Sequence, residues 1–507
     1  MATEATAAAE GNEIETKVPA RLDRLPWAKW HWMVIIGLGT VWILDGLEVT
    51  IIGSIGDRLT EGGSGISLDA SQIGSAAACY VAGACVGALF FGQLTDRFGR
   101  KKLFLVTLGL YIAATVATGF AWTAWYFFAC RFLTGMGIGG EYAAINSAID
   151  ELIPARLRGR VDLIINGSYW VGASVGALLT VPLLDTSIFA EDFGWRLAFL
   201  IGAVLGVGIL IVRKNVPESP RWLFIHGRND EAEQITGEIE DEVRAETGEE
   251  LEEVPDDAKL TIHQRATIPF REIASVAIHK YPKRTILGLS LFVGQAFIYN
   301  AVTFDLGTIL GEFFNVGSGQ VPLYIAVFGV SNFLGPLTLG RLFDTVGRKA
   351  MISLCYLTSA ALTAALGILL LSTTPSTWVF MAFVLAIFYF ASSGASAAYL
   401  TVSEIFPMES RALSIAFFYA VGTGLGGIVG PLLFGELINT GELEKVALGF
   451  LLGAVVMAVG GIAEILFGVN AEGKTLESIA EPLSAAKRRV QSGAEVGSGQ
   501  EPPAAMV

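Results

Sequence analysis

The stretch GQLTDRFGRK at residues 92–101 decides the fold, because it recurs as GRLFDTVGRK at residues 340–349, 248 residues further along. A second motif, Glu-x-x-Pro followed by arginine, occupies 151–158 and returns at 404–411, an offset of 253 residues. A looser match relates 217–221 to 472–477. Self-similarity at a nearly constant offset is the signature of an internal repeat. The chain is therefore predicted to consist of two related halves joined by a linker.

About twelve apolar stretches divide the chain, which is 53% apolar and only 16% charged. About 20 helical residues, rising 1.5 Å each, cross roughly 30 Å of hydrocarbon. We therefore predict an all-α membrane protein of twelve transmembrane helices in two pseudo-symmetric six-helix bundles. The expected spans are approximately 31–55, 72–94, 102–121, 124–149, 161–184, 195–213, 284–310, 319–340, 350–372, 376–402, 412–437 and 445–468.

Basic residues predict the orientation, because lysine and arginine in short loops stay on the cytoplasmic side. The loops after the second, fourth and eighth spans are basic, whereas the alternate loops carry only Arg58, Arg196 and Lys445. Both termini are thus expected in the cytoplasm and the protein in the cell membrane. The expected parts are a tail at 1–30, a bundle at 31–213, a linker at 214–283, a bundle at 284–468 and a tail at 469–507.

The linker holds most of the net charge of -14, with fourteen acidic residues and one basic residue, Arg244, between positions 230 and 257. We interpret it as a solvated, partly helical cytosolic segment; the alternative is an acidic docking site. The four cysteines lie in apolar stretches and the four histidines are scattered, so no metal site is expected. No nucleophile–base pair or nucleotide-binding loop indicates an enzyme or a cofactor. The expected partners are the bilayer and a small molecule, with no nucleic acid, and a monomer is expected.

The repeated loops resemble the signature motifs of the major facilitator superfamily across nearly the whole chain. RFLTGMGIGGE at 131–141, the two Glu-x-x-Pro motifs and PESPR at 217–221 are most similar to its sugar-porter and metabolite:proton symporter branches, including the aromatic acid type. The resemblance implies two bundles that rock about a central site to give alternating access. The loop motifs either keep the loops on the cytoplasmic side or form a gate. The candidate gating residues are Gly92, Asp96, Arg97, Gly99, Arg100, Glu151, Arg158, Gly340, Asp344, Gly347, Arg348, Glu404 and Arg411.

Three charged residues within spans are candidates for proton coupling, because an ionisable group in the membrane is costly. Asp45 and Glu48, at i and i+3, share one face of the first span, and Arg131 lies in the fourth. Counting residues places Asp45 and Arg131 at a similar depth, each roughly 20 Å from the cytoplasmic end. An aspartate–arginine pair could then release on protonation; the alternative is a structural ion pair. The spacing of the two acids resembles the first span of aromatic-acid symporters, which implies that all three residues couple protons.

Amides and aromatic residues in the spans are candidate substrate contacts, because an amide in lipid would lack hydrogen-bond partners. The resemblance to sugar porters implies ligand roles for Gln295 and Asn300 in the seventh span and Asn166 in the fifth. Tyr399 stands where sugar porters have tryptophan, and Gly294 where they have a second glutamine. Trp170, one turn beyond Asn166, covers the ligand or packs within the bundle.

These patterns predict a secondary active transporter, a proton-coupled symporter that imports a small polar metabolite such as an organic or aromatic acid. A sugar:proton symporter is the first alternative. A non-transporting membrane sensor and an exporter on the same fold are further alternatives, although the fifth span lacks the glycine-proline motif common in proton-driven drug exporters.

Overall fold

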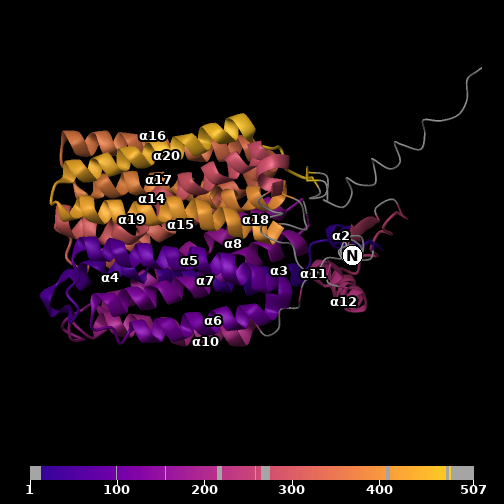
Figure 1. Cartoon of the computed structure of the whole chain (residues 1–507), viewed down its shortest axis with the longest axis horizontal. Helices are drawn as coiled ribbons and strands as arrows, with labels where there is room; N and C mark the ends of the chain where they lie inside the picture. The colour runs from indigo at the N-terminus through magenta and orange to yellow at the C-terminus, as the bar shows by residue number, and fades with distance from the viewer. Residues whose placement is uncertain are drawn as a thin grey trace, which may run out of the picture.

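Long helices lying side by side form the body of this computed structural model (Figure 1). It describes residues 13–98, 100–154, 156–213, 218, 220–225, 227–256, 259–263, 275–406, 411–474 and 479–480. The helices of the first half lie together below those of the second half in the view of Figure 1. Short helices and the N-terminal segment cover one end of the bundle, here called the linker end.

The first half contributes six helical rods, two of which are interrupted. Their bounds are α3 Lys29–Val49 with α4 Ile51–Thr60, α5 Ala70–Phe98, α6 Arg100–Thr118, α7 Ala124–Leu152, α8 Arg158–Gly167 with α9 Tyr169–Leu183, and α10 Gly194–Arg213. Hydroxyl groups mark the two interruptions: Thr50 Oγ1 donates to Gly46 O, and Ser168 Oγ donates to Ile165 O at 2.6 Å. Such back-bonding competes with the helical ladder and bends helices.

The second half contributes six more rods within the described residues. They are α14 Pro282–Phe314, α15 Val321–Thr345, α16 Arg348–Ser372, α17 Thr377–Ile405, α18 Arg411–Phe418 with η5 Tyr419–Thr423 and α19 Gly424–Asn439, and α20 Leu443–Phe467. Local sequence sets several ends: Pro282 opens α14, Asn315 closes it in the left-handed region at φ 53°, and Ser376 caps α17 by accepting from Val379 N.

These rods agree with the predicted spans to within about five residues at each end. Nine of them, among the described residues, are long and apolar enough to cross a membrane, and α6 and α10 include shorter apolar helices. With α7 the described chain has twelve rods in two sets of six. The sequence prediction of a twelve-helix, all-α membrane fold is confirmed, apart from a small strand pair outside the bundle.

A layer at the linker end joins the N-terminal segment to the linker (Figure 1). Its elements are α2 Val18–Asp23, α11 Pro220–Ile225, α12 Asn229–Thr247 and an antiparallel pair of strands, β1 Glu13–Thr16 and β2 Leu260–His263. The apolar residues Ala232, Ile239 and Val243 recur along one face of α12 and are buried. The linker is therefore partly helical, as predicted, but one face of its helix is packed rather than solvated.

Candidate functional site

A cavity of about 130 Å³ lies between the two halves of the bundle. Its walls come from α3, α5, α8 and α9 of the first half and from α14, α17 and η5 of the second. Eight of the eighteen lining residues are tryptophan, tyrosine or phenylalanine, and most of the others are amides, hydroxyls or small side chains. None of these described lining residues is Asp, Glu, Lys, Arg or His. The cavity therefore offers ring faces and neutral hydrogen-bonding groups.

The five residues predicted as substrate contacts all line this one cavity: Asn166, Trp170, Gln295, Asn300 and Tyr399. They come from four helices and both halves of the chain, so the fold brings together residues up to 233 positions apart. Asn166 Nδ2 donates to Asp162 O at 3.0 Å and Asn300 Nδ2 donates to Ala296 O at 2.8 Å, both within their own helices. These bonds fix the orientation of the two amides. Their role as substrate ligands stays a prediction.

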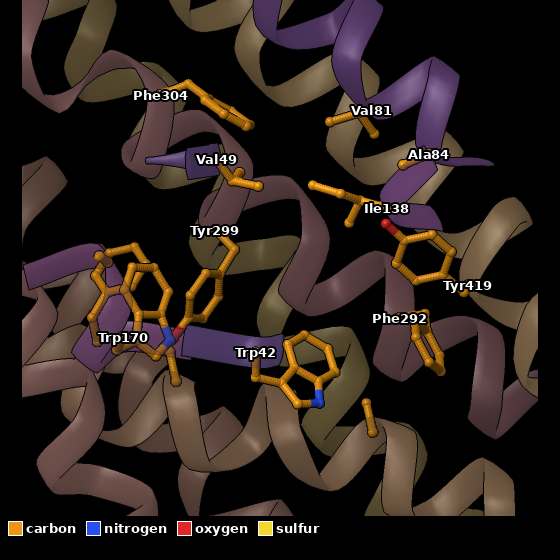
Figure 2. Packing of buried hydrophobic residues seen from close by; sticks show 14 of the residues in the cluster. Trp42, Val49, Val81, Ala84, Ile138, Trp170, Phe292, Tyr299, Phe304 and Tyr419 are labelled. Atoms are coloured by element: carbon orange, nitrogen blue, oxygen red, sulfur yellow. The ribbon is translucent and has the colours of Figure 1, made fainter. Parts of the chain in front are cut away.

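Aromatic side chains that the sequence analysis did not single out complete the walls. Trp170 packs against Tyr299 with ring centroids 5.5 Å apart (Figure 2). The ring centroids of Trp42 and Tyr399 lie 6.5 Å apart across the two halves. The hydroxyl of Tyr299 donates to Oδ1 of Asn332, which is fully buried on α15. Tyr299 directly precedes Asn300 in the sequence. Its position next to Asn300 could have identified Tyr299 as a lining residue. Nothing in the sequence around Trp42 or Tyr80 indicates that they line a cavity.

A buried ion pair lies close to the cavity. Arg131 Nη1 of α7 is 3.0 Å from Glu48 Oε1 of α3, and both side chains are fully buried. Thr115 of α6 donates to the same oxygen at 3.0 Å. Asp45 lies one turn earlier on α3 and is 2% exposed. The structure thus places the three predicted coupling residues together, with Glu48 rather than Asp45 as the carboxylate 3.0 Å from the guanidinium.

One side chain, Tyr80 of α5, connects the ion pair to the cavity. Tyr80 lines the cavity, and the guanidinium carbon of Arg131 lies 5.0 Å from the centroid of its ring. A cation at that distance from an aromatic face is attracted by the ring quadrupole. The charged pair is therefore next to the cavity without being part of its walls.

The two halves contact each other at both ends of the bundle. At the linker end the backbone N–H of Arg160 donates to Asp344 Oδ2 at 2.9 Å. At the opposite end Ser71 Oγ donates to Glu436 Oε1 at 2.9 Å. Movement of the halves about the cavity must break one set of contacts or the other.

The loop motif of the second half forms a charged cluster at the linker end. Arg348 bonds the carboxylate of Glu404 through two hydrogen bonds of 3.1 Å and Asp344 Oδ1 at 2.7 Å. Gly340 lies four residues before Asp344, and Gly347 directly precedes Arg348. In the first half Arg158 lies 3.8 Å from Asp23 of α2, and Gly92 faces Ala416 of α18. The remaining predicted gating residues have side chains that are not among those the structure describes: Asp96, Arg97, Gly99, Arg100, Glu151 and Arg411.

Comparisons with known proteins agree with this architecture. Residues 28–483 match the family described as Sugar (and other) transporter. The fold resembles that of the major facilitator superfamily proton:xylose symporter XylE, solved with 6-bromo-6-deoxy-D-glucose. The TM-score is 0.71 at 18% identity, covering 89% of this chain and 98% of that one. Fold and family together define a membrane transporter of the major facilitator superfamily.

The chain belongs to the Sugar (and other) transporter family within that class. It is 27% identical to the niacin transporter NiaP of Acinetobacter baylyi over 463 residues, which cover 91% of this chain and 99% of that protein. It is 30% identical to the putative metabolite transport protein YdjK of Escherichia coli, with 91% and 96% covered. It is 24% identical to the 4-hydroxybenzoate transporter PcaK of Pseudomonas putida, with 88% and 95% covered. The family resemblance inferred from the sequence is thus confirmed.

Proposed function

We propose that this protein is a proton-coupled symporter that imports a small aromatic acid by alternating access. The observation that carries the proposal is the fully buried Glu48–Arg131 pair, one side chain away from a cavity between the two halves. Protonation of the carboxylate would free the guanidinium, so proton binding and bundle movement can be linked. The cell membrane, cytoplasmic termini and a monomeric state belong to the same proposal.

The cavity supports a single-ring substrate. Its volume of about 130 Å³ is close to that of an engineered protein cavity of about 150 Å³ that binds benzene. Trp42, Trp170 and Tyr399 present ring faces, which favour stacked or edge-to-face contacts with an aromatic ligand. Gln295 and Asn300 supply hydrogen-bonding groups. Two of the relatives above are named for niacin and 4-hydroxybenzoate, which are aromatic acids.

Transport into proteoliposomes tests the proposal. We expect labelled nicotinate or 4-hydroxybenzoate to accumulate when the lumen is more alkaline than the medium, and a protonophore to abolish the accumulation. Protein-free vesicles measure passive entry of the neutral acid. Uptake that reaches only equilibrium, with no effect of the pH gradient, would contradict proton coupling.

A sugar:proton symporter is the second candidate, favoured by the two amides Gln295 and Asn300 in the cavity wall. Against it, Gly294 packs next to Tyr356 and Gly460, away from the described cavity lining, so the second glutamine of sugar porters has no counterpart there. Accumulation of xylose, with no uptake of either aromatic acid, would favour this candidate. Binding without transport would favour a sensor, and proton-driven efflux an exporter.

A further inference from the structure

The cavity poses an electrostatic problem for the aromatic acid of the proposed function. A carboxylate moved out of water needs an opposite charge or strong hydrogen-bond donors. No described lining residue carries a positive charge. The nearby cation of the ion pair, Arg131, is fully buried behind the cavity wall.

Four described lining residues have a buried hydroxyl without a hydrogen-bond partner among the described residues: Tyr80, Thr303, Ser392 and Thr423. Of these four, Tyr80 is the one whose ring lies against a cation, Arg131. Tyr80 therefore has the hydroxyl best suited to a carboxylate. Its side chain is 4% exposed, and its hydroxyl has no hydrogen-bond partner among the described residues. Buried hydroxyl groups normally have a partner, and an exception calls for an explanation. A ligand in the cavity that Tyr80 lines would supply the missing acceptor.

Arg131 makes Tyr80 a stronger donor than an ordinary phenol. The guanidinium lies 5.0 Å from the ring centroid, so its charge draws electron density from the ring and leaves the hydroxyl hydrogen more positive. Nε and Nη2 of Arg131 have no hydrogen-bond partner among the described residues. Besides its ion pair with Glu48, the guanidinium lies against the rings of Tyr80 and Phe199.

Backbone packing fixes Tyr80 relative to Arg131. A Cβ atom added at Gly135, one turn after Arg131 on α7, would lie 2.0 Å from the carbonyl oxygen of Tyr80. A Cβ added at Gly83 of α5 would lie 2.0 Å from the carbonyl oxygen of Phe132. The two helices thus touch backbone to backbone within one turn of the pair. The cation and the phenol form a preorganised unit.

We propose that Tyr80 binds the carboxylate of the substrate and thereby determines specificity for an acid over its neutral analogue. This inference rests on the proposed function. The inference assigns a substrate contact, Tyr80, that was not among the predicted ones. Arg131 acts on the ligand through the ring of Tyr80.

Two tyrosine variants and two ligand pairs test the inference. The Tyr80→Phe variant keeps the ring under Arg131 and removes the hydroxyl. The control is Tyr111→Phe on α6, because Tyr111 is also buried and its hydroxyl also has no hydrogen-bond partner in the described part of the chain, yet it does not line the cavity. The ligand pairs are nicotinate with nicotinamide and 4-hydroxybenzoate with 4-hydroxybenzamide. Dissociation constants are measured by calorimetry on the purified full-length protein.

We expect Tyr80→Phe to weaken binding of the acid by about tenfold or more, in line with a hydrogen bond to a charged group. Its effect on the amide should be clearly smaller, so the ratio of the two dissociation constants falls. Tyr111→Phe should leave that ratio as in the wild type. Equal weakening of acid and amide by Tyr80→Phe, or no change, would overturn the inference while leaving the proposed function intact. A wild-type protein that binds neither acid would overturn the proposed function, and the inference with it.

Discussion

Arg131 and Glu48 form an ion pair in which both side chains are fully buried and Nη1 lies 3.0 Å from Oε1. The pair joins α7 to α3, and Thr115 of α6 adds a third helix through its hydrogen bond to the same oxygen. Oε2 of Glu48 has no hydrogen-bond partner among the described residues. Loss of the charge on Glu48 would therefore weaken a contact that ties three helices beside the cavity.

The first prediction concerns proton coupling. Glu48→Gln keeps the size and a hydrogen-bonding oxygen but can neither be charged nor bind a proton. We expect accumulation driven by a pH gradient to fall at least about tenfold, because the variant has no carboxylate to take up a proton, while exchange of labelled for unlabelled substrate continues. Both are measured in proteoliposomes. Asp45→Asn is assayed in parallel, and full proton-driven accumulation by both variants would contradict the coupling assignment.

The second prediction concerns stability. Arg131→Leu leaves the carboxylate of Glu48 buried without its countercharge, and breaking a buried pair from one side costs about 3–5 kcal/mol. We expect a clear fall in the apparent melting temperature of the purified protein. The double variant Arg131→Leu with Glu48→Leu should recover much of the loss, because it removes both charges. A double variant less stable than Arg131→Leu would contradict this account.

The third prediction concerns movement of the two halves. Gly53 of α4 touches α14 so closely that an added Cβ would lie 2.3 Å from the carbonyl oxygen of Thr303. Gly53→Val should prevent this contact between the halves and hold that end of the bundle apart. We expect transport to fall at least about tenfold while ligand binding is retained, because alternating access requires both ends to close in turn.

The control for Gly53→Val is Gly62→Ala, since a Cβ at Gly62 of η1 (Gly62–Ser64) meets nothing within 4 Å. Transport by this control should stay near the wild-type rate. Parallel loss of binding and transport in Gly53→Val would instead indicate a folding defect.

Much of the fold could be predicted because lipid imposes a simple length rule on helices. Each predicted span overlaps one helical rod, and the repeat offset located both halves. Depth counting also placed the charged residues of the first and fourth spans at one level. It paired Arg131 with Asp45, whereas the ion pair in the structure is with Glu48. The two acids are separated by less than one turn of helix, about 5 Å, so counting residues along the helix does not separate them. Side-chain packing selects Glu48 as the partner 3.0 Å from Arg131.

The cavity could be predicted only in part from the sequence. Four of the five predicted contacts were found by matching sugar-porter positions, and Trp170 by its place one turn beyond Asn166; all five line the cavity. Tyr80 and Trp42 were missed, because a single aromatic residue in an apolar span looks the same whether it faces lipid, a neighbouring helix or a cavity. The layer at the linker end was missed for another reason: no periodic pattern indicates that α2 will meet α12.

The fourth prediction concerns the contact between α2 and α12. Glu240 of α12 accepts hydrogen bonds from Arg21 at 2.9 and 2.6 Å and from Arg24 at 2.7 Å. Burial alone would raise the pKa of Glu240, but these hydrogen bonds and the charges of both arginines outweigh it and lower the pKa below its usual value of 4.5. A carboxyl group with a lowered pKa in the folded state stabilises that state above its unfolded pKa. The contact should therefore be constant near pH 7 and weaken as the pH falls below about 4.5.

Hydrogen–deuterium exchange checks this prediction. The protection factors of the amides in α2 are compared after correction for the effect of pH on intrinsic exchange rates. At pH 7 we expect Glu240→Gln to reduce protection of α2 by about tenfold, because the hydrogen bonds from both arginines lose their charged acceptor. Asp241→Asn is the matched control, because the Asp241 side chain is 77% exposed and pairs with Arg244 on its own helix. Acid should lower protection in the wild type and in Asp241→Asn, with little further effect in Glu240→Gln. Equal protection of α2 in all three proteins at pH 7 would show that the ion pairs do not hold it against the linker.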